Sequence, residues 1–125
     1  HRFHGYNKLT TVYRKGQTSR SSLMSLKYYK NPRRSSYRLA VVVSRKVHKS
    51  AVVRNRIRRR IFELYRLNVP VFLDQYDMIV TVFSEQIADT AAVDLRIMIE
   101  KQLKQAGIIP EETATQHRKK PNDVL

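Results

Sequence analysis

The residues best suited to chemistry lie in one basic stretch, SRKVHKSAVVRNRIRRRIFELYR, at positions 44–66. Apolar residues recur in it with helical spacing, which predicts an amphipathic helix over about 51–68, with Ser50 as N-cap and Pro70 beyond its end. The inward residues would be Val53, Ile57, Ile61 and Leu64. The outward crest would then be Asn55, Arg59, Phe62 and Arg66, flanked by Arg54 and Arg58 on one side and by Arg56 and Arg60 on the other.

An array of guanidinium groups on one helix face indicates phosphate binding, because each planar group can donate to two oxygens at once. The alternative is a solvated helix face, but such a face normally mixes both signs, and positions 51–62 contain no acid. Asn55 could add a contact to a base edge or a 2′-hydroxyl. The loop before the helix extends the basic patch, near a helix N-terminus that also favours anions. The candidate residues are Arg45, Lys46, Lys49, Arg54, Asn55, Arg56, Arg58 and Arg59.

The charge of the whole chain is divided unevenly between its two halves. Residues 1–62 hold eighteen Lys and Arg and no acid, whereas residues 63–125 hold seven basic and ten acidic residues, so that +18 and −3 give the net +15. A cationic half that repels itself indicates a polyanionic partner. Nucleic acid is favoured over a membrane surface, since the chain has no Trp and its apolar residues fit a protein core.

Several other classes are excluded or disfavoured by composition. The absence of Cys excludes disulfides and thiolate metal sites, and no segment is apolar for the roughly 20 residues that a membrane span needs. We expect a cytoplasmic protein. The four histidines (His1, His4, His48, His117) are scattered, and Asp74 and Asp77 fit turn and strand-start roles. We therefore predict no catalytic residue and no metal ligand in this chain.

The remaining patterns predict an α+β domain over residues 1–109. We expect a helix at 7–15, strands at 22–30, 37–44 and 77–83, and a second long helix at 89–106 that ends at Gly107. The valine-rich strand at 37–44 is predicted to be central and covered on both faces. The order αββαβα suggests one sheet and one helical layer, with the strands that flank the basic helix parallel to each other. Residues 110–125 are expected to form a disordered tail.

The basic stretch also resembles the signature of the bacterial ribonuclease P protein family. The resemblance rests on Lys46, Ala51-Val52, Arg54-Asn55-Arg56 and Arg58-Arg59, and the order of elements extends it from about Phe3 to Gly107. Phe62 stands where many members carry another basic residue. The resemblance implies a two-layer α/β sandwich with a mixed sheet, room for one more short strand, and a left-handed βαβ crossover. General rules for such crossovers would give the right hand.

By the same resemblance, the chain would join a catalytic ribonuclease P RNA that requires Mg²⁺ and removes the 5′ leader of precursor tRNA. The protein would bind no cofactor and would need no protein partner. The basic residues would contact the RNA subunit. The leader would lie between the sheet and the first helix, against Leu9, Tyr13, Lys27, Tyr28, Tyr37 and Arg38. Tyr13 and Tyr28 could equally be ordinary tyrosines at the edge of the core.

Two other functions share the same charge pattern. A structural ribosomal protein or a general RNA chaperone would also be basic, but neither would be expected to carry Arg-Asn-Arg on a helix that follows a valine-rich strand. A DNA-binding module is a third candidate, although the apolar stripe of its helix would suggest packing on a sheet.

Overall fold

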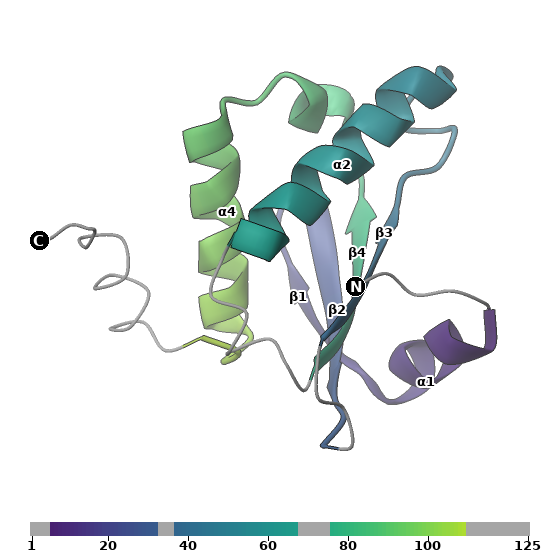
Figure 1. Cartoon of the computed structure of the whole chain (residues 1–125), viewed down its shortest axis with the longest axis vertical. Helices are drawn as coiled ribbons and strands as arrows, with labels where there is room; N and C mark the ends of the chain where they lie inside the picture. Colours follow the sequence, from purple (N-terminus) through teal and green to yellow (C-terminus); the bar gives the residue numbers. More distant parts are fainter. Residues whose placement is uncertain (1–5, 33–36, 68–75, 110–125) are drawn as a thin grey trace, which may run out of the picture.

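The computed structural model describes residues 6–32, 37–67 and 76–109, with the side chains of residues 6–10 excepted (Figure 1). The elements, in chain order, are α1 (Tyr6–Lys15), β1 (Gln17–Arg20), β2 (Met24–Lys30), β3 (Arg38–Val42), α2 (Ala51–Leu67), β4 (Tyr76–Val82), the 3₁₀ helix η1 (Glu85–Ala88) and α4 (Ala92–Gln105). The predicted α+β class is confirmed, and β1 is the additional short strand.

The four strands form one mixed sheet in the order β1-β2-β4-β3. β2 pairs antiparallel with β1 and with β4, while β3 and β4 are parallel neighbours. The chain passes from β3 to β4 through α2, as predicted for the strands that flank the basic helix. The left hand of this crossover remains a prediction.

The hydrophobic core lies between one face of the sheet and the helices α2 and α4. Alternate strand residues point into it, among them Leu26 of β2 and Leu39 of β3. Ile57 and Ile61 of α2 and Leu95 of α4 meet them, and all five residues are completely buried. Figure 1 shows α2 crossing this face of the sheet with α4 beside it.

The opposite face of the sheet is partly covered by α1, which contacts β2 and β4. Val12 of α1 and Ile79 of β4 are completely buried but stand apart from the main core. Ile79 alternates with core-facing Met78 and Val80, so it points to the other face. α1 therefore lies on the face of the sheet opposite α2 and α4.

Local signals explain where α2 and α4 begin and end. The Ser50 hydroxyl accepts a hydrogen bond from the backbone N–H of Val53 at 3.3 Å, which confirms Ser50 as the N-cap of α2. Gly107 has a φ of 78° and ends α4, and the N–H of Ile108 donates to the carbonyl of Leu103. That pattern is the Schellman termination for which glycine is favoured.

Three expectations about these elements were wrong. The valine-rich strand β3 is at the edge of the sheet with only alternate residues buried, and β4 is the strand covered on both faces. The helix predicted at 89–106 begins three residues later, at Ala92, because η1 precedes it. Tyr65 of α2, not predicted to face inward, is completely buried. The predicted tail at 110–125 lies outside the described residues.

Candidate nucleic-acid interface

The outward face of α2 carries two arginines that are available to an external partner. Arg56 and Arg59 are both exposed, and within the described residues neither guanidinium group bonds to another protein group. Asn55, on the same crest, is also exposed. Phe62 departs from the predicted crest, since it is half-buried against the core. The predicted phosphate-binding face is thus centred on Arg56 and Arg59.

Arg54 and Arg58, by contrast, hold the surrounding backbone. Arg54 Nη1 donates to the carbonyls of His48 and Lys49, at 3.0 and 2.8 Å. Arg58 donates to Asn55 Oδ1 at 2.7 Å and to the carbonyl of Val43 at 3.2 Å. These two arginines fix the loop that leads into α2, and only their remaining N–H groups are open to a ligand.

The loop that Arg54 holds presents the other predicted cations, Arg45, Lys46 and Lys49, all of which are exposed. The backbone N–H of Ser50 donates to His48 Nδ1 at 3.0 Å, and His48 Nε2 lies 3.7 Å from Glu85 Oε1 of η1. His48 is therefore a loop residue with local partners. The three loop cations directly precede α2 in the chain, so they and the arginines of the helix belong to one continuous basic segment.

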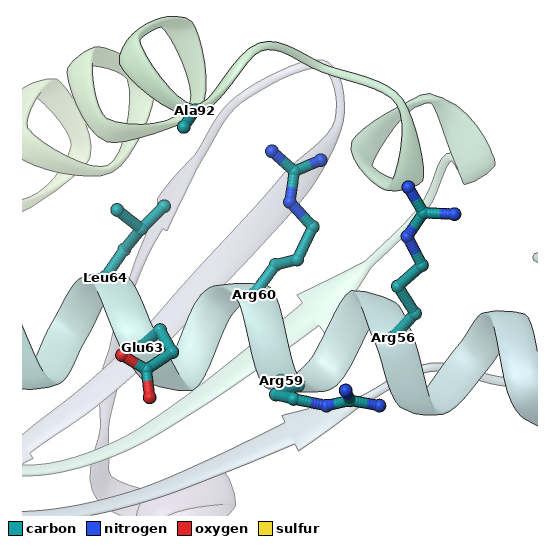
Figure 2. A pocket seen from close by; sticks show the side chains of 6 residues that line it. All are labelled: Arg56, Arg59, Arg60, Glu63, Leu64 and Ala92. Atoms are coloured by element: carbon teal, nitrogen blue, oxygen red, sulfur yellow. The ribbon is translucent and has the colours of Figure 1, made fainter.

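Arg60, on the flank of α2, connects the helix to η1 and α4. Its guanidinium donates to the carbonyls of Ile87 at 2.6 Å, Ala88 at 3.0 Å and Thr90 at 2.5 Å. Figure 2 shows Arg56 and Arg60 directed toward this connection, and Arg59 extending along α2. With Glu63, Leu64 and Ala92, these arginines line a hollow of about 270 Å³.

The predicted leader-binding residues are divided between the two faces of the sheet. Tyr13 of α1 is 47% exposed, and Lys27 points to the same face as α1 because it pairs with Ile79. Tyr37 is 8% exposed in the core, so its predicted contact with a leader is wrong. Tyr28 pairs with core-facing Met78 and lies on that side too. Leu9 is in α1, but its side chain is outside the described part of the structure.

Arg38 is on the α1 side of the sheet but is already neutralised. Its Nε and Nη2 donate to the two carboxylate oxygens of Asp77, at 2.9 and 2.8 Å, and Asn31 also reaches Asp77 at 3.4 Å. The Asp77 side chain is only 2% exposed. This pair was not predicted from the sequence, where Asp77 was assigned only a turn or strand-start role.

Residues 6–32, 37–67 and 76–109 contain neither a membrane-spanning helix nor a cluster of metal ligands. None of the helices found there is long and apolar enough to cross a membrane. No group of three or more His, Cys, Asp or Glu side chains there could hold a metal ion.

Taken together, the fold and this surface define a small basic α+β protein with a helix that presents arginines. Known proteins of this kind match it closely. The ribonuclease P family model matches residues 1–107. The ribonuclease P protein component of Roseiflexus castenholzii is 35% identical over 98 residues, which cover 78% of this chain and 79% of the relative. That of Clostridium novyi is 36% identical over 98 residues, covering 78% and 85%.

A solved structure gives the same result for the fold. The RNase P protein of Staphylococcus aureus superposes with a TM-score of 0.74 at 24% identity, covering 86% of this chain and 95% of that one. The chain belongs to the ribonuclease P protein family. Its place is therefore in tRNA processing, as part of a ribonuclease with an RNA partner.

Proposed function

We propose that this chain binds a catalytic RNA and the 5′ leader of precursor tRNA, and so assists endonucleolytic removal of the leader by that RNA. The observation that carries the proposal is the state of the arginines on α2. Arg56 and Arg59 are exposed without a protein partner among the described residues, beside a loop with three more exposed cations. An uncompensated array of this kind is stable mainly against phosphates.

The RNA subunit would lie against the α2 crest and the loop at 45–49. Arg54 and Arg58 would act mainly by positioning, because their hydrogen bonds to backbone carbonyls shape the loop and the helix start. Arg56 and Arg59 would make the direct phosphate contacts, and Asn55 could read a base edge or a 2′-hydroxyl.

The leader would lie on the α1 side of the sheet, where Tyr13 and Lys27 are found. A half-exposed tyrosine and a lysine on the same side of the sheet suit a single strand, which is held by aromatic stacking and by charge. The Mg²⁺ that the reaction requires would be bound by the RNA. The protein residues would contribute by holding RNA strands, not by supplying ligands to the metal.

A binding experiment tests the RNA-subunit surface. The double variant Arg56→Ala/Arg59→Ala and the control Lys101→Ala/Lys104→Ala lose the same charge, the latter from α4. We expect the arginine variant to weaken binding to a bacterial ribonuclease P RNA and to flatten its salt dependence by about two units of slope, roughly one for each phosphate contact. Equal losses in both variants would show that only net charge matters, which would contradict the assignment of α2.

A further inference from the structure

A hollow of about 460 Å³ lies between the turn that joins β1 to β2 and one flank of α4. Its size falls in the roughly 300–1,000 Å³ range of small-molecule sites. We call it the glutamine pocket. The turn contributes residues 21–23 to its lining, η1 contributes Gln86, and α4 contributes Met98, Lys101, Gln102 and Gln105. Met98, Lys101 and Gln105 follow one another at spacings of three and four, so they share one flank of the helix.

The walls of the glutamine pocket are fixed by hydrogen bonds within the protein. In the turn, the carbonyl of Leu23 accepts from the backbone N–H of Phe83 at 2.8 Å, which ties the turn to the end of β4. In η1, the backbone N–H of Gln86 donates to the Ser84 hydroxyl at 3.1 Å. The pocket is therefore formed in advance, as most small-molecule sites are.

Gln102 forms the floor of the pocket and has one polar atom without a partner. The residue is 2% exposed, whereas the other lining residues of α4 are half-buried or exposed. Its Nε2 donates to the carbonyls of Ser19 at 3.0 Å and Met24 at 3.2 Å, which fixes the amide and directs Oε1 away from both. Within the described residues, Oε1 accepts no hydrogen bond. A buried acceptor without a donor is unfavourable, so a ligand that donates to Gln102 would be favoured.

The rest of the lining combines amide, cationic and apolar groups. Gln86 and Gln105 are exposed, and each amide can both donate and accept. Lys101 is exposed, and its ammonium group has no ion pair within the described part of the chain. Leu23 and Met98, both half-buried, supply apolar surface from two different walls. No acidic side chain is found among the described residues that line the pocket.

This combination fits a purine nucleotide. The base has an amino group or ring N–H that can donate to Gln102, and further polar atoms for the other two amides. Its flat body can pack on Leu23 and Met98, and its phosphate is an anion of the kind that Lys101 attracts. We propose that the glutamine pocket binds a free purine nucleoside monophosphate, with its base over Gln102 and its phosphate beside Lys101.

The pocket is separate from the surface proposed for the RNA subunit. β2 begins at Met24, which pairs with Val82 of β4, and β3 ends at Val42, which pairs with Thr81 of β4. The turn before β2 and the basic loop after β3 are therefore at the same end of the sheet. They lie at its opposite edges, because the strand order is β1-β2-β4-β3. The inference thus goes beyond the proposed function and does not depend on it.

The methionines provide a local test with an internal control. The chain has three, of which Met98 lines the pocket, while Met24 and Met78 are completely buried in the core. In protein with isotopically labelled methionine methyl groups, NMR titration with GMP or AMP should shift the Met98 signal saturably and leave that of Met78 unchanged. Met98→Leu assigns the signal. A Met98 signal that does not move at millimolar nucleotide concentration would overturn the proposal.

Two lysines of α4 test the phosphate contact. Lys101→Ala should bind GMP about tenfold more weakly, because it removes the cation beside the phosphate. Its affinity for guanosine, which has no phosphate, should not change. Lys104→Ala removes the same charge from the same helix but outside the pocket lining, so it should bind GMP like the wild type. The same loss in both variants would show that only net charge attracts the nucleotide, which would refute the pocket.

The amides of the rim test recognition of the base. Gln102→Leu would also remove two hydrogen bonds to the backbone near the turn, so the exposed pair Gln86→Ala/Gln105→Ala is used instead. This double variant should bind GMP and guanosine alike about tenfold more weakly, since it loses two hydrogen bonds to the base. Urea unfolding establishes that it is folded. Wild-type affinity for both ligands would contradict base recognition in the pocket.

A purine nucleotide could also be supplied by RNA, and competition distinguishes the two sources. Equilibrium dialysis measures the radiolabelled GMP bound by the protein with and without saturating ribonuclease P RNA, with the RNA alone as the blank. GMP should stay bound when the RNA is present, because the pocket and the basic loop are at opposite edges of the sheet. Loss of the bound GMP would assign the pocket to a nucleotide of the RNA and would overturn a free nucleotide as its ligand.

Discussion

Arg38 and Asp77 form a bidentate ion pair between the edge strand β3 and the central strand β4, with the Asp77 side chain almost completely buried. The pair joins the two parallel strands at the end of the sheet remote from the basic loop. Removal of one partner leaves the other charge desolvated without compensation, which is more damaging than loss of an exposed pair.

Arg38→Ala is therefore expected to lower the free energy of unfolding by about 3 kcal/mol or more, measured by urea denaturation. The double variant Arg38→Met/Asp77→Leu, which removes both charges, should recover most of that loss. A change below about 0.5 kcal/mol in Arg38→Ala would show that the pair contributes as little as a surface salt bridge.

Substitutions of two adjacent arginines of α2, Arg59 and Arg60, should have different effects, one on RNA binding and the other on the free energy of unfolding. Arg60→Ala removes three hydrogen bonds to carbonyls and should destabilise the fold by about 2–4 kcal/mol. Arg59→Ala should leave unfolding unchanged and weaken binding to the catalytic RNA, with a salt slope flatter by about one unit. Both variants require the same two measurements, urea unfolding and an RNA titration. A stable Arg60→Ala protein, or an Arg59→Ala protein with wild-type affinity, would contradict this division.

The leader assignment depends on Tyr13. Tyr13→Ala should weaken binding of leader-bearing precursor tRNA by about 1–3 kcal/mol, the contribution of one stacked base, and leave mature tRNA unaffected. The affinities of the holoenzyme for the two RNAs provide the comparison, with Tyr13→Phe as the control that keeps the ring. Equal losses for both RNAs would place the effect elsewhere than the leader.

Tyr65 predicts a pH effect on stability. Burial raises the pKa of its hydroxyl, which has no hydrogen-bond partner in the described part of the chain. The folded state keeps this group protonated, while the unfolded state ionises near the ordinary tyrosine pKa of about 10. Ionisation of Tyr65 therefore leaves the free energy of unfolding unchanged below that pH and lowers it as the pH rises above it.

Tyr65→Phe should thus stabilise the protein by about 1 kcal/mol at neutral pH, since it removes a buried polar group without a partner. The advantage of the variant should grow at alkaline pH. Urea unfolding of both proteins at neutral pH and above pH 10 gives the comparison. A destabilised variant would mean that the hydroxyl makes a hydrogen bond in solution.

The long elements could be predicted from sequence because their periodicity is strong. The apolar repeat of α2 and the β-branched run of β4 each reflect burial, and both were located to within one or two residues. β1 was expected only through the resemblance and was not located, because Gln-Thr-Ser-Arg has no apolar alternation and the strand is held by its pairing with β2. The valine-rich run of β3 suggested a central strand, yet the order of strands depends on long-range pairing that composition does not encode.

The segment that forms the candidate site was predicted from the sequence. Which of its arginines are exposed and which bond to the protein backbone was not. Sequence placed the arginines of α2 on one surface, and their exposure confirms this for Arg56 and Arg59. It could not show that Arg54, Arg58 and Arg60 bond to carbonyls, because those acceptors belong to loops and helix ends whose positions depend on the fold. Tyr37 was misplaced for the same reason, since nothing in its own segment distinguishes the two faces of an edge strand.

Cleavage of precursor tRNA at low Mg²⁺ concentration tests whether this protein assists a catalytic RNA. The reaction is run with a bacterial ribonuclease P RNA alone, with this protein alone, and with both together. We expect little cleavage by the RNA alone under these conditions, none by the protein alone, and efficient removal of the 5′ leader by the two together. If the protein fails to stimulate the RNA, or cleaves the precursor at the leader junction without it, the account is contradicted.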